Sequence, residues 1–232
     1  MLSIFIKSKD SILLQKKHIF ANMDKQTKLA LENGELLPLM EAFYSIQGEG
    51  FHTGKAAYFL RIGGCDVGCH WCDVKESWDA NLHPLTEVEE IIKLIDGIKV
   101  NTVVITGGEP LMWNLNLLCN HLRQKGLQVH LETSGVYPMS GEFDWICFSP
   151  KKNQKALDEI KQLANELKII VQNKHDLKWA KQQQSKVFTS CKLYLQPEWS
   201  KRDEVMPLIT DFVMENTEWQ ISLQTHKYMN LP

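Results

Sequence analysis

The chain has 232 residues, which is enough for one large domain with a sizeable core. Hydrophobic residues make up 44% and charged residues 23% of it, and both fractions are ordinary for a globular protein. Because 26 basic residues are balanced by 28 acidic ones, the net charge of -2 argues against nucleic acid as the main partner.

An N-terminal segment precedes a second methionine, Met23. Residues 1–6 are largely apolar, but charged residues follow at once, before the apolar core of a signal peptide develops. No run in the chain approaches the roughly 20 apolar residues of a membrane helix. We predict a dispensable N-terminal extension within residues 1–35, foremost residues 1–22, and a single domain over residues 36–232.

Residues 36–45 predict an approach segment that ends in a strand. The polar loop that follows, Ile46-Gln47-Gly48-Glu49-Gly50, is spaced by glycines, which permit close backbone approach to a ligand. Gln47 and Glu49 alternate, so they project to the same side if the segment is extended. Taken alone, however, the segment favours a plain tight turn with solvated side chains over a ligand site.

Residues 56–62 predict a buried strand that delivers the next loop. Arg61 lies in this apolar run, and a buried arginine without a partner is costly. It is therefore either paired with a protein carboxylate or directed at an anionic ligand, because its planar fork matches a carboxylate.

Three cysteines, Cys65, Cys69 and Cys72, follow with CxxxCxxC spacing among several glycines. Thiolates held this close favour zinc or iron–sulfur, and three ligands leave one metal position open, as a catalytic centre needs. The alternative is a structural zinc site with His70 or a remote residue as the fourth ligand. The other cysteines stand singly, and we expect them to be buried in the core of a protein from a reducing compartment; they are Cys119, Cys147 and Cys191.

Beyond the cysteine loop, predicted strands and helices alternate. Thr86 and Glu89 suggest a capping box at the start of the first helix, which Gly97 would end. The alternation predicts a parallel sheet of about six βα units, an incomplete TIM-type barrel. The predicted strands cover residues 102–106, 127–132, 143–148, 167–172, 192–196 and 219–223. The later predicted helices cover residues 111–125, 155–166, 175–184 and 202–216, the last kinked or started late at Pro207.

Polar motifs recur where these predicted strands end. Ligands bind at the carboxyl edge of the strands in parallel α/β folds, so we expect the motifs to converge on one mouth, which the cysteine loop also reaches. The motifs are residues 106–110, 132–135, 149–151 and 196–197 and His226.

The Gly107-Gly108-Glu109-Pro110 motif lies about one βαβ unit beyond the cysteines. Alone it is a weak signal, equally typical of a strand-to-helix turn with proline at the helix start. In this order the two motifs, with aromatic Trp71 directly before the last cysteine, resemble the radical S-adenosylmethionine (SAM) enzymes. The resemblance implies that the cysteines hold three irons of a [4Fe–4S] cluster and that SAM binds the fourth iron.

The finer resemblance is to the 7-carboxy-7-deazaguanine synthases, radical SAM enzymes of queuosine biosynthesis, and it runs from about Glu41 to Pro232. It implies a radical-initiated ring contraction of 6-carboxy-5,6,7,8-tetrahydropterin to 7-carboxy-7-deazaguanine with loss of ammonia, which is a lyase reaction, with SAM regenerated. The matching pieces are residues 43–50, Arg61, the cysteine loop, residues 106–110, 132–135, 149–151, 196–197 and 224–227, and Pro232.

The resemblance also implies residue roles. The catalytic residues would be Arg61, Glu132 and His226, with Arg61 clamping the substrate carboxylate. SAM would be bound by Trp71, Cys72, Asp73, Gly108, Glu109, Ser149, Pro150, Lys151 and Gln196. The substrate would be bound by Ile46, Gln47, Gly48, Glu49, Arg61, Thr106, Glu132, His226 and Pro232.

Two positions call for comment. The last residue given is Pro232, and a terminal carboxylate there is ionised at neutral pH. The resemblance implies that this carboxylate accepts hydrogen bonds from the pterin amino group. Without the resemblance, a frayed terminus is an equally good interpretation. Val74 stands where the family commonly has a threonine whose hydroxyl helps to bind Mg²⁺. Either Mg²⁺ uses substrate oxygens and water near Asp73 or Ser77, or metal dependence is weak.

The family also implies a cytoplasmic homodimer that takes electrons from flavodoxin or ferredoxin and contacts neither nucleic acid nor membrane. One alternative is another small radical SAM enzyme, such as a glycyl-radical activase, although activases lack the Gln47/Glu49 loop. A second alternative is a non-enzymatic zinc-binding module. Protein purified without air would be brown with a [4Fe–4S] cluster and colourless with zinc.

Overall fold

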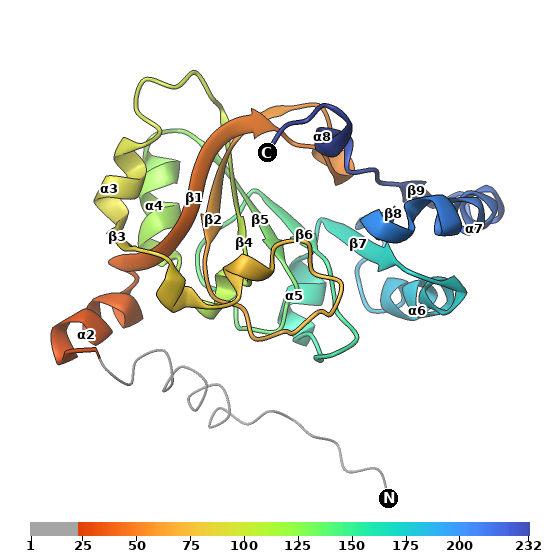
Figure 1. Ribbon diagram of the computed structural model, residues 1–232, viewed down its shortest axis with the longest axis horizontal. Coiled ribbons are helices and arrows are strands. Elements are labelled where there is room, and N and C mark those ends of the chain that lie inside the picture. Colours follow the sequence, from red (N-terminus) through yellow and green to blue (C-terminus); the bar gives the residue numbers. More distant parts are fainter. Residues whose placement is uncertain (1–22) are drawn as a thin grey trace, which may run out of the picture.

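A computed structural model describes residues 23–232, so the predicted extension over residues 1–22 lies outside the described residues. One sheet of nine strands, in the order β3-β1-β2-β4-β5-β6-β7-β8-β9, curves through this part of the chain (Figure 1). The strands are β1 Leu36–Ile46, β2 Ala56–Ile62, β3 Leu85–Glu87, β4 Thr102–Gly107, β5 Gln128–Thr133, β6 Trp145–Phe148, β7 Glu166–Val171, β8 Lys192–Pro197 and β9 Trp219–Ile221.

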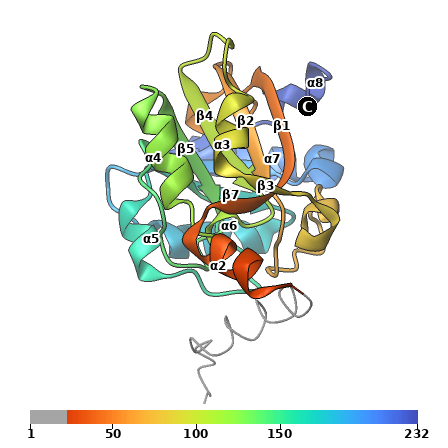
Figure 2. The same cartoon turned by 90° about the vertical axis from the view of Figure 1, so that its left-hand side faces the viewer.

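The strands from β2 through β4 to β9 run parallel, whereas β1 is antiparallel to both β2 and β3. Six parallel strands follow the cysteine loop and the sheet does not close, which confirms the incomplete TIM-type barrel. Helices follow the strands and pack on the sheet and on one another (Figures 1 and 2). They are α2 Lys25–Asn33, α3 Val88–Lys93, α4 Asn116–Gln124, α5 Asp158–Leu163, α6 Lys174–Gln184, α7 Arg202–Glu215 and α8 Thr225–Tyr228.

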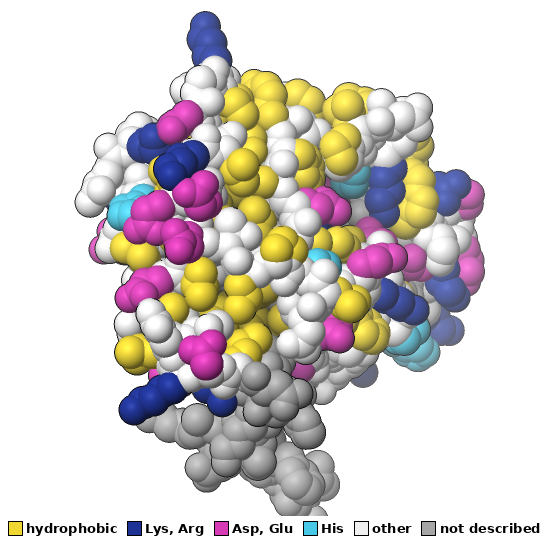
Figure 3. All heavy atoms as spheres, turned by 60° about the vertical axis from the view of Figure 1, so that its left-hand side comes forward, with side chains coloured by type: hydrophobic (Ala, Val, Ile, Leu, Met, Phe, Trp, Pro, Cys, Tyr) yellow, Lys and Arg dark blue, Asp and Glu magenta, His cyan; other side chains and the backbone are white. Residues whose placement is uncertain are grey.

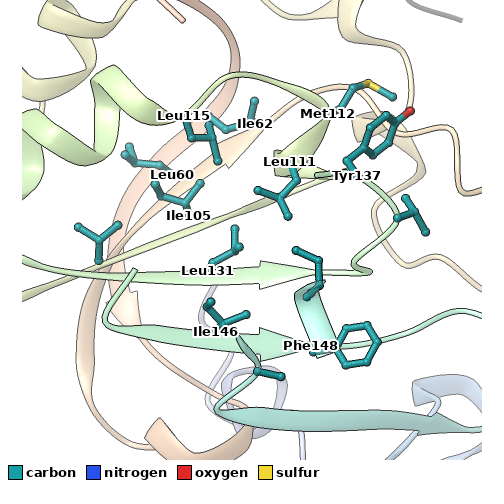
Figure 4. Close-up of a cluster of buried hydrophobic side chains, with 14 of the residues drawn as sticks. Leu60, Ile62, Ile105, Leu111, Met112, Leu115, Leu131, Tyr137, Ile146 and Phe148 are labelled. Carbon is teal, nitrogen blue, oxygen red and sulfur yellow. The ribbon is translucent and has the colours of Figure 1, made fainter. Parts of the chain in front are cut away.

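Branched apolar side chains of neighbouring parallel strands form the core. Leu60, Ile105 and Leu131 come from β2, β4 and β5 and are fully buried, and Leu115 covers them from the segment before α4 (Figure 4). Burying such a side chain contributes about 1.5–3 kcal/mol relative to leaving it exposed. The parallel strands therefore hold the loops at their carboxyl ends in fixed positions.

Some predicted boundaries are wrong. Thr86 is not a helix cap: it lies in β3, where its backbone pairs with Leu37, and α3 begins after Glu87 without a side-chain cap. The predicted 111–125 helix starts late, at Asn116, after a 3₁₀ turn over Pro110–Met112. At β3, strand pairing overrides local propensity. At the 3₁₀ turn, the Glu109 carboxylate accepts from the Leu111 N–H while Thr133 and Ser134 hold it in place.

Two further boundaries also differ. Helix α5 begins only at Asp158, and Glu166, expected to end it, already belongs to β7. Helix α7 begins at Arg202 and continues through Pro207, so the late start at this proline is wrong.

Helix α2 is tied to the rest of the fold. Asp24 caps it by accepting from two backbone N–H groups, Leu31 is buried, and the Asn114 amide donates to the Glu32 carbonyl at 3.0 Å. The Val88 N–H donates to the Glu35 carbonyl at 2.9 Å. Among residues 23–232, no helix is both long and apolar enough to cross a bilayer.

Candidate active site

A cavity of about 450 Å³ brings the scattered motifs together. It runs from the cysteine loop, at the carboxyl end of β2, to the loop over residues 47–52, which follows β1 and so lies at the opposite end of β2. Two predicted site residues, Glu109 and Pro150, do not line it. Those that do are Ile46, Gln47, Gly48, Glu49, Arg61, Cys65, Cys69, Trp71, Cys72, Asp73, Thr106, Gly108, Glu132, Ser149, Lys151, Gln196, His226 and Pro232.

The cysteine loop is held by its backbone and by two amide side chains. The Cys65 N–H donates to the Trp78 carbonyl at 3.0 Å, and the Cys72 N–H donates to the Cys69 carbonyl at 2.9 Å. Asn153 donates to the Gly68 carbonyl at 2.7 Å, and Gln154 donates to the carbonyl of Asp66 at 2.7 Å. These bonds place the three cysteine side chains on one wall of the cavity.

The donor set fits an iron–sulfur cluster better than one zinc ion. All three thiols are unpaired by disulfides, yet within residues 23–232 no three His, Cys, Asp or Glu side chains converge on one ion. A cluster binds each thiolate at a different iron, so its ligands need not converge. His70, the zinc alternative, has its ring nitrogen 3.1 Å from the Gln172 amide oxygen. Burial raises the pKa of the Cys65 thiol to about 12, so a metal must displace its proton.

The double glycine fits where the end of β4 crosses the cysteine loop. The Gly108 N–H donates to the Ile62 carbonyl at 3.0 Å, and the Glu109 N–H donates to the Gly64 carbonyl at 2.9 Å. A Cβ atom on Gly108 would lie 2.4 Å from the Gly64 oxygen. A side chain there would force the two loops apart.

The Glu109 side chain points into the protein. Its carboxylate accepts from the Leu111 N–H at 3.2 Å, the Thr133 hydroxyl at 2.6 Å, and both the N–H and the hydroxyl of Ser134. Burial raises the pKa of this carboxyl, and the four hydrogen bonds oppose that rise. In this arrangement Glu109 organises the end of β5, and its contact with SAM stays a prediction.

Ser149, Lys151 and Trp71 form a second wall near the cysteines. The Lys151 ammonium donates to the Ser149 carbonyl at 2.8 Å and lies 5.3 Å from the Trp71 ring centre. Burial lowers the pKa of Lys151, and the Cys69 thiol opposes the shift. The wall combines an aromatic face with one cation, a combination that suits a heteroaromatic ligand with anionic groups.

The neighbourhood of Val74 does not fit a Mg²⁺ site. The Asp73 carboxylate accepts from the Lys227 ammonium at 2.8 Å and from the Gln224 amide at 3.3 Å. The Ser77 hydroxyl is buried and donates to the Val74 carbonyl at 2.7 Å. Mg²⁺ prefers oxygen ligands in an octahedral arrangement, whereas here Val74 offers no oxygen, the Ser77 hydroxyl is buried and Asp73 Oδ2 is bonded to Lys227 and Gln224.

The loop after β1 is not a solvated turn, so the simpler sequence interpretation is wrong. Gln47 is buried, and its amide donates to Glu132 at 3.0 Å and accepts from the Glu49 N–H at 3.0 Å. The Gly48 carbonyl accepts from the Thr225 N–H at 2.9 Å. A Cβ atom on Gly48 would lie 2.1 Å from His226 Nδ1, so glycine is needed for this close approach.

Sequence reasoning missed one buried cation, Lys168, in the middle of β7. Its ammonium is bonded to the Glu49 carboxylate and lies 3.2 Å from Glu132 Oε2. Burial by itself would raise the pKa of Glu49, but Lys168 and Gln224 bring it down to about 2. The available signal was a lysine within the mainly apolar run of residues 167–171, where an unpaired charge would be costly.

Arg61 and Pro232 also line the cavity. Arg61 Nε donates to Glu41 at 3.3 Å, and its guanidinium lies 6.0 Å from the Phe43 ring centre, so a protein carboxylate pairs with it at the cavity wall. The Ser45 hydroxyl donates to the Pro232 oxygen at 3.4 Å, which brings the end of the chain beside β1.

Comparison with known proteins gives consistent matches. The Radical SAM superfamily model matches residues 60–172. The chain is 55% identical over 210 residues to the 7-carboxy-7-deazaguanine synthase of Flavobacterium psychrophilum, covering 90% of this chain and 100% of that protein. It is 45% identical over 194 residues to the synthase of the same name from Synechocystis, covering 84% of this chain and 93% of that protein. The crystal structure of QueE from Escherichia coli superposes with a TM-score of 0.75 at 27% identity, covering 86% of this chain and 99% of that one.

Proposed function

The chain belongs to the 7-carboxy-7-deazaguanine synthases of the radical SAM superfamily, and we propose that it converts 6-carboxy-5,6,7,8-tetrahydropterin to 7-carboxy-7-deazaguanine. The pterin ring contracts and ammonia leaves, in the biosynthesis of queuosine and related 7-deazaguanines. Loss of ammonia without hydrolysis places the reaction among the lyases. The observation that carries the proposal is one cavity with three cysteines at one end and paired carboxylates at the other.

The cysteine end of the cavity suits the cofactors. Cys65, Cys69 and Cys72 would hold the [4Fe–4S] cluster, since thiolates are the ligands that such clusters take. When bound, the cluster and SAM supply radical chemistry that removes a hydrogen atom from the substrate carbon bearing the carboxylate. The residues proposed to bind SAM are Trp71, Cys72, Asp73, Gly108, Glu109, Ser149, Pro150, Lys151 and Gln196.

The opposite end suits the substrate. Glu49 and Glu132 accept hydrogen bonds, so they would bind the N–H groups of a pterin. Arg61 would pair with the substrate carboxylate, as its position in the cavity wall allows. The protein thereby orients the reacting carbon and leaves the radical chemistry to the cofactors. The remaining residues proposed to contact substrate are Ile46, Gln47, Gly48, Thr106, His226 and Pro232.

The assembly and its surroundings are part of the proposal. A one-electron carrier such as flavodoxin or ferredoxin would reduce the cluster, and the six unpaired cysteines suit the reducing cytoplasm. A homodimer is supported by apolar side chains gathered on the face toward which β1 and α3 lie (Figure 3). On these elements Tyr44 is 49% exposed, and Leu94, directly after α3, is 45% exposed. Light scattering of the purified protein would measure the oligomeric state.

The proposal is tested by turnover. Protein reconstituted without air is reduced and incubated with SAM and 6-carboxytetrahydropterin, and the products are followed by mass spectrometry. We expect 7-carboxy-7-deazaguanine and ammonia in equal amounts. Formation of 5′-deoxyadenosine without this product would keep the superfamily and overturn the substrate, as for an activase. A protein that bound zinc and left SAM intact would overturn both the radical SAM chemistry and the proposed substrate.

A further inference from the structure

The Lys168 ammonium lies between two carboxylates that come from distant parts of the chain. It is bonded to Glu49 from the loop after β1 and to Glu132 from β5, while Lys168 itself belongs to β7. The whole residue is 3% exposed, and its side chain lines the cavity. The ion-pair cluster of Lys168, Glu49 and Glu132 therefore joins the loop after β1 to strands β5 and β7 at the cavity wall.

Other charged or titratable groups face this cluster from several elements. Glu166 faces Lys168 from the same strand, Cys147 from β6 and Lys151 from the loop after β6. His226 from α8 and Asp73 from the cysteine loop face Glu49. Burial disfavours every one of these charges unless an opposite charge compensates it. Lys168 is bonded to both Glu49 and Glu132, so the two carboxylates share its charge as their compensation.

Ionisation decides which ligands the cavity accepts. An ionised carboxylate only accepts hydrogen bonds, whereas a protonated one also donates. Gln47 also holds this pair of carboxylate residues in place, because its amide group donates to Glu132 and its oxygen accepts from the Glu49 N–H. Gln224 donates to the second oxygen of Glu49 at 2.9 Å. A ring that presents amino and N–H donors suits such carboxylates, whereas a ring carbonyl facing them is repelled.

Resting on the function proposed above, we propose that Lys168 is a positioning residue that fixes Glu49 and Glu132 as acceptors, so that the site selects a 2-amino pterin over its 2-oxo analogue, a lumazine. Lys168 acts through the two carboxylates rather than on the reacting carbon. Its removal leaves Glu49 without its bonded cation, so Glu49 takes up a proton more readily, and the site then loses both affinity and the ability to reject the 2-oxo ring.

The test measures binding, so it needs no turnover. Equilibrium dialysis without air, with the cluster-loaded, unreduced protein and SAM, compares 6-carboxypterin with 6-carboxylumazine. We expect the wild-type protein to prefer the pterin by about 100-fold, because a mismatched polar group is left unpaired. K168M should weaken pterin binding by about 30-fold or more and reduce the preference to about fivefold or less. K168R, which keeps the charge, should restore most of the preference.

A matched control and a pH series separate positioning from simple stabilisation. Lys161 is also buried and pairs with a carboxylate, Asp158, but it lies in α5 away from the cavity. K161M should bind both ligands as the wild type does. Between about pH 6 and pH 7.5, pterin affinity should stay level in the wild type and rise with pH in K168M as Glu49 ionises.

The outcomes distinguish this inference from the proposed function. If K168M folds and keeps both affinity and preference, the positioning role is wrong while the function stands. If K168M does not fold, K168Q provides the same comparison, because it keeps one donor without the charge. A wild-type protein that binds neither ring would overturn both the function and the inference, and a wild type that binds both rings equally would overturn the selectivity alone.

Discussion

At one end of the cavity the three cysteines stand within eight consecutive residues, whereas at the other end the polar side chains come from separate elements. The cysteine loop is held mainly by backbone hydrogen bonds and by amides from residues 153–154. The opposite end is held by side-chain contacts that join the loop after β1 to β5, β7 and α8. The comparison teaches that a contiguous site can be found from its spacing, while an assembled site depends on which strands become neighbours.

The largest expected effect is at the contiguous end. C69A removes one of three proposed cluster ligands, so we expect loss of most bound iron and a fall in turnover of at least about 1,000-fold. Iron analysis and absorption spectra measure the bound iron, and product formation measures the turnover. C191A, at a buried cysteine outside the cavity, should keep both. Equal iron loss in the two variants would contradict the assignment.

A smaller effect is expected at the opposite end of the cavity, where the loop after β1 packs against His226. G48A would place a Cβ atom 2.1 Å from His226 Nδ1, so we expect kcat/KM for the pterin to fall by about 10- to 100-fold with iron content unchanged. G54A is the control for backbone strain in the same loop region, because Gly54 has a φ of 86° but open space around it, so it lacks the clash with His226. Loss of iron in G48A would show that the two ends are not independent.

The ion pair at Glu49 should appear in the pH dependence of stability. Its pKa is lowered from 4.5 to about 2, so its stabilising contribution is fully present above about pH 4.5 and is lost as the pH falls toward 2. In E49Q we expect a shallower loss of unfolding free energy over this window, by about 1–3 kcal/mol. Urea denaturation at several acidic pH values measures it, and parallel curves for the two proteins would contradict the pairing.

Metal dependence should be weak, because Val74 offers no oxygen, the Ser77 hydroxyl is buried and bonded, and Asp73 Oδ2 is paired with Lys227. We expect EDTA or added Mg²⁺ to change the turnover rate by less than about twofold. The substitution V74T, which introduces a hydroxyl, is the matched variant and should make the rate respond to Mg²⁺. A many-fold response in the unaltered protein would contradict weak dependence.

The smallest effect is expected at the N-terminus. A chain that begins at Met23 keeps all residues of the cavity and the Asp24 cap of α2, so we expect unchanged solubility and turnover. Further removal to residue 36 deletes the buried Leu31, so it should cost about 2–5 kcal/mol of stability. Thermal unfolding of the two shortened chains distinguishes these expectations, and an insoluble or inactive chain from Met23 would overturn the first.

Local patterns predicted much of this molecule. The β-branched runs predicted β4 and β7 to within about a residue, because buried parallel strands are continuously apolar. Helix starts were less accurate, since Thr86 pairs as a strand and Glu109 caps a 3₁₀ turn. Strand pairing joins Thr86 to distant Leu37, and distant Thr133 and Ser134 hold the Glu109 carboxylate, so no local window contains these contacts.

By itself, the sequence determined the incomplete parallel barrel, the three-cysteine motif, the double glycine and the family, because each is recorded in local patterns. Tertiary structure alone decided that Gln47 is buried and Glu49 half-buried, that Glu109 turns into the protein, and that Lys168 joins two carboxylates. The physical reason is that a buried charge is stable only beside its partner. Here the partners lie 119 and 36 positions away along the chain, so only folding brings them together.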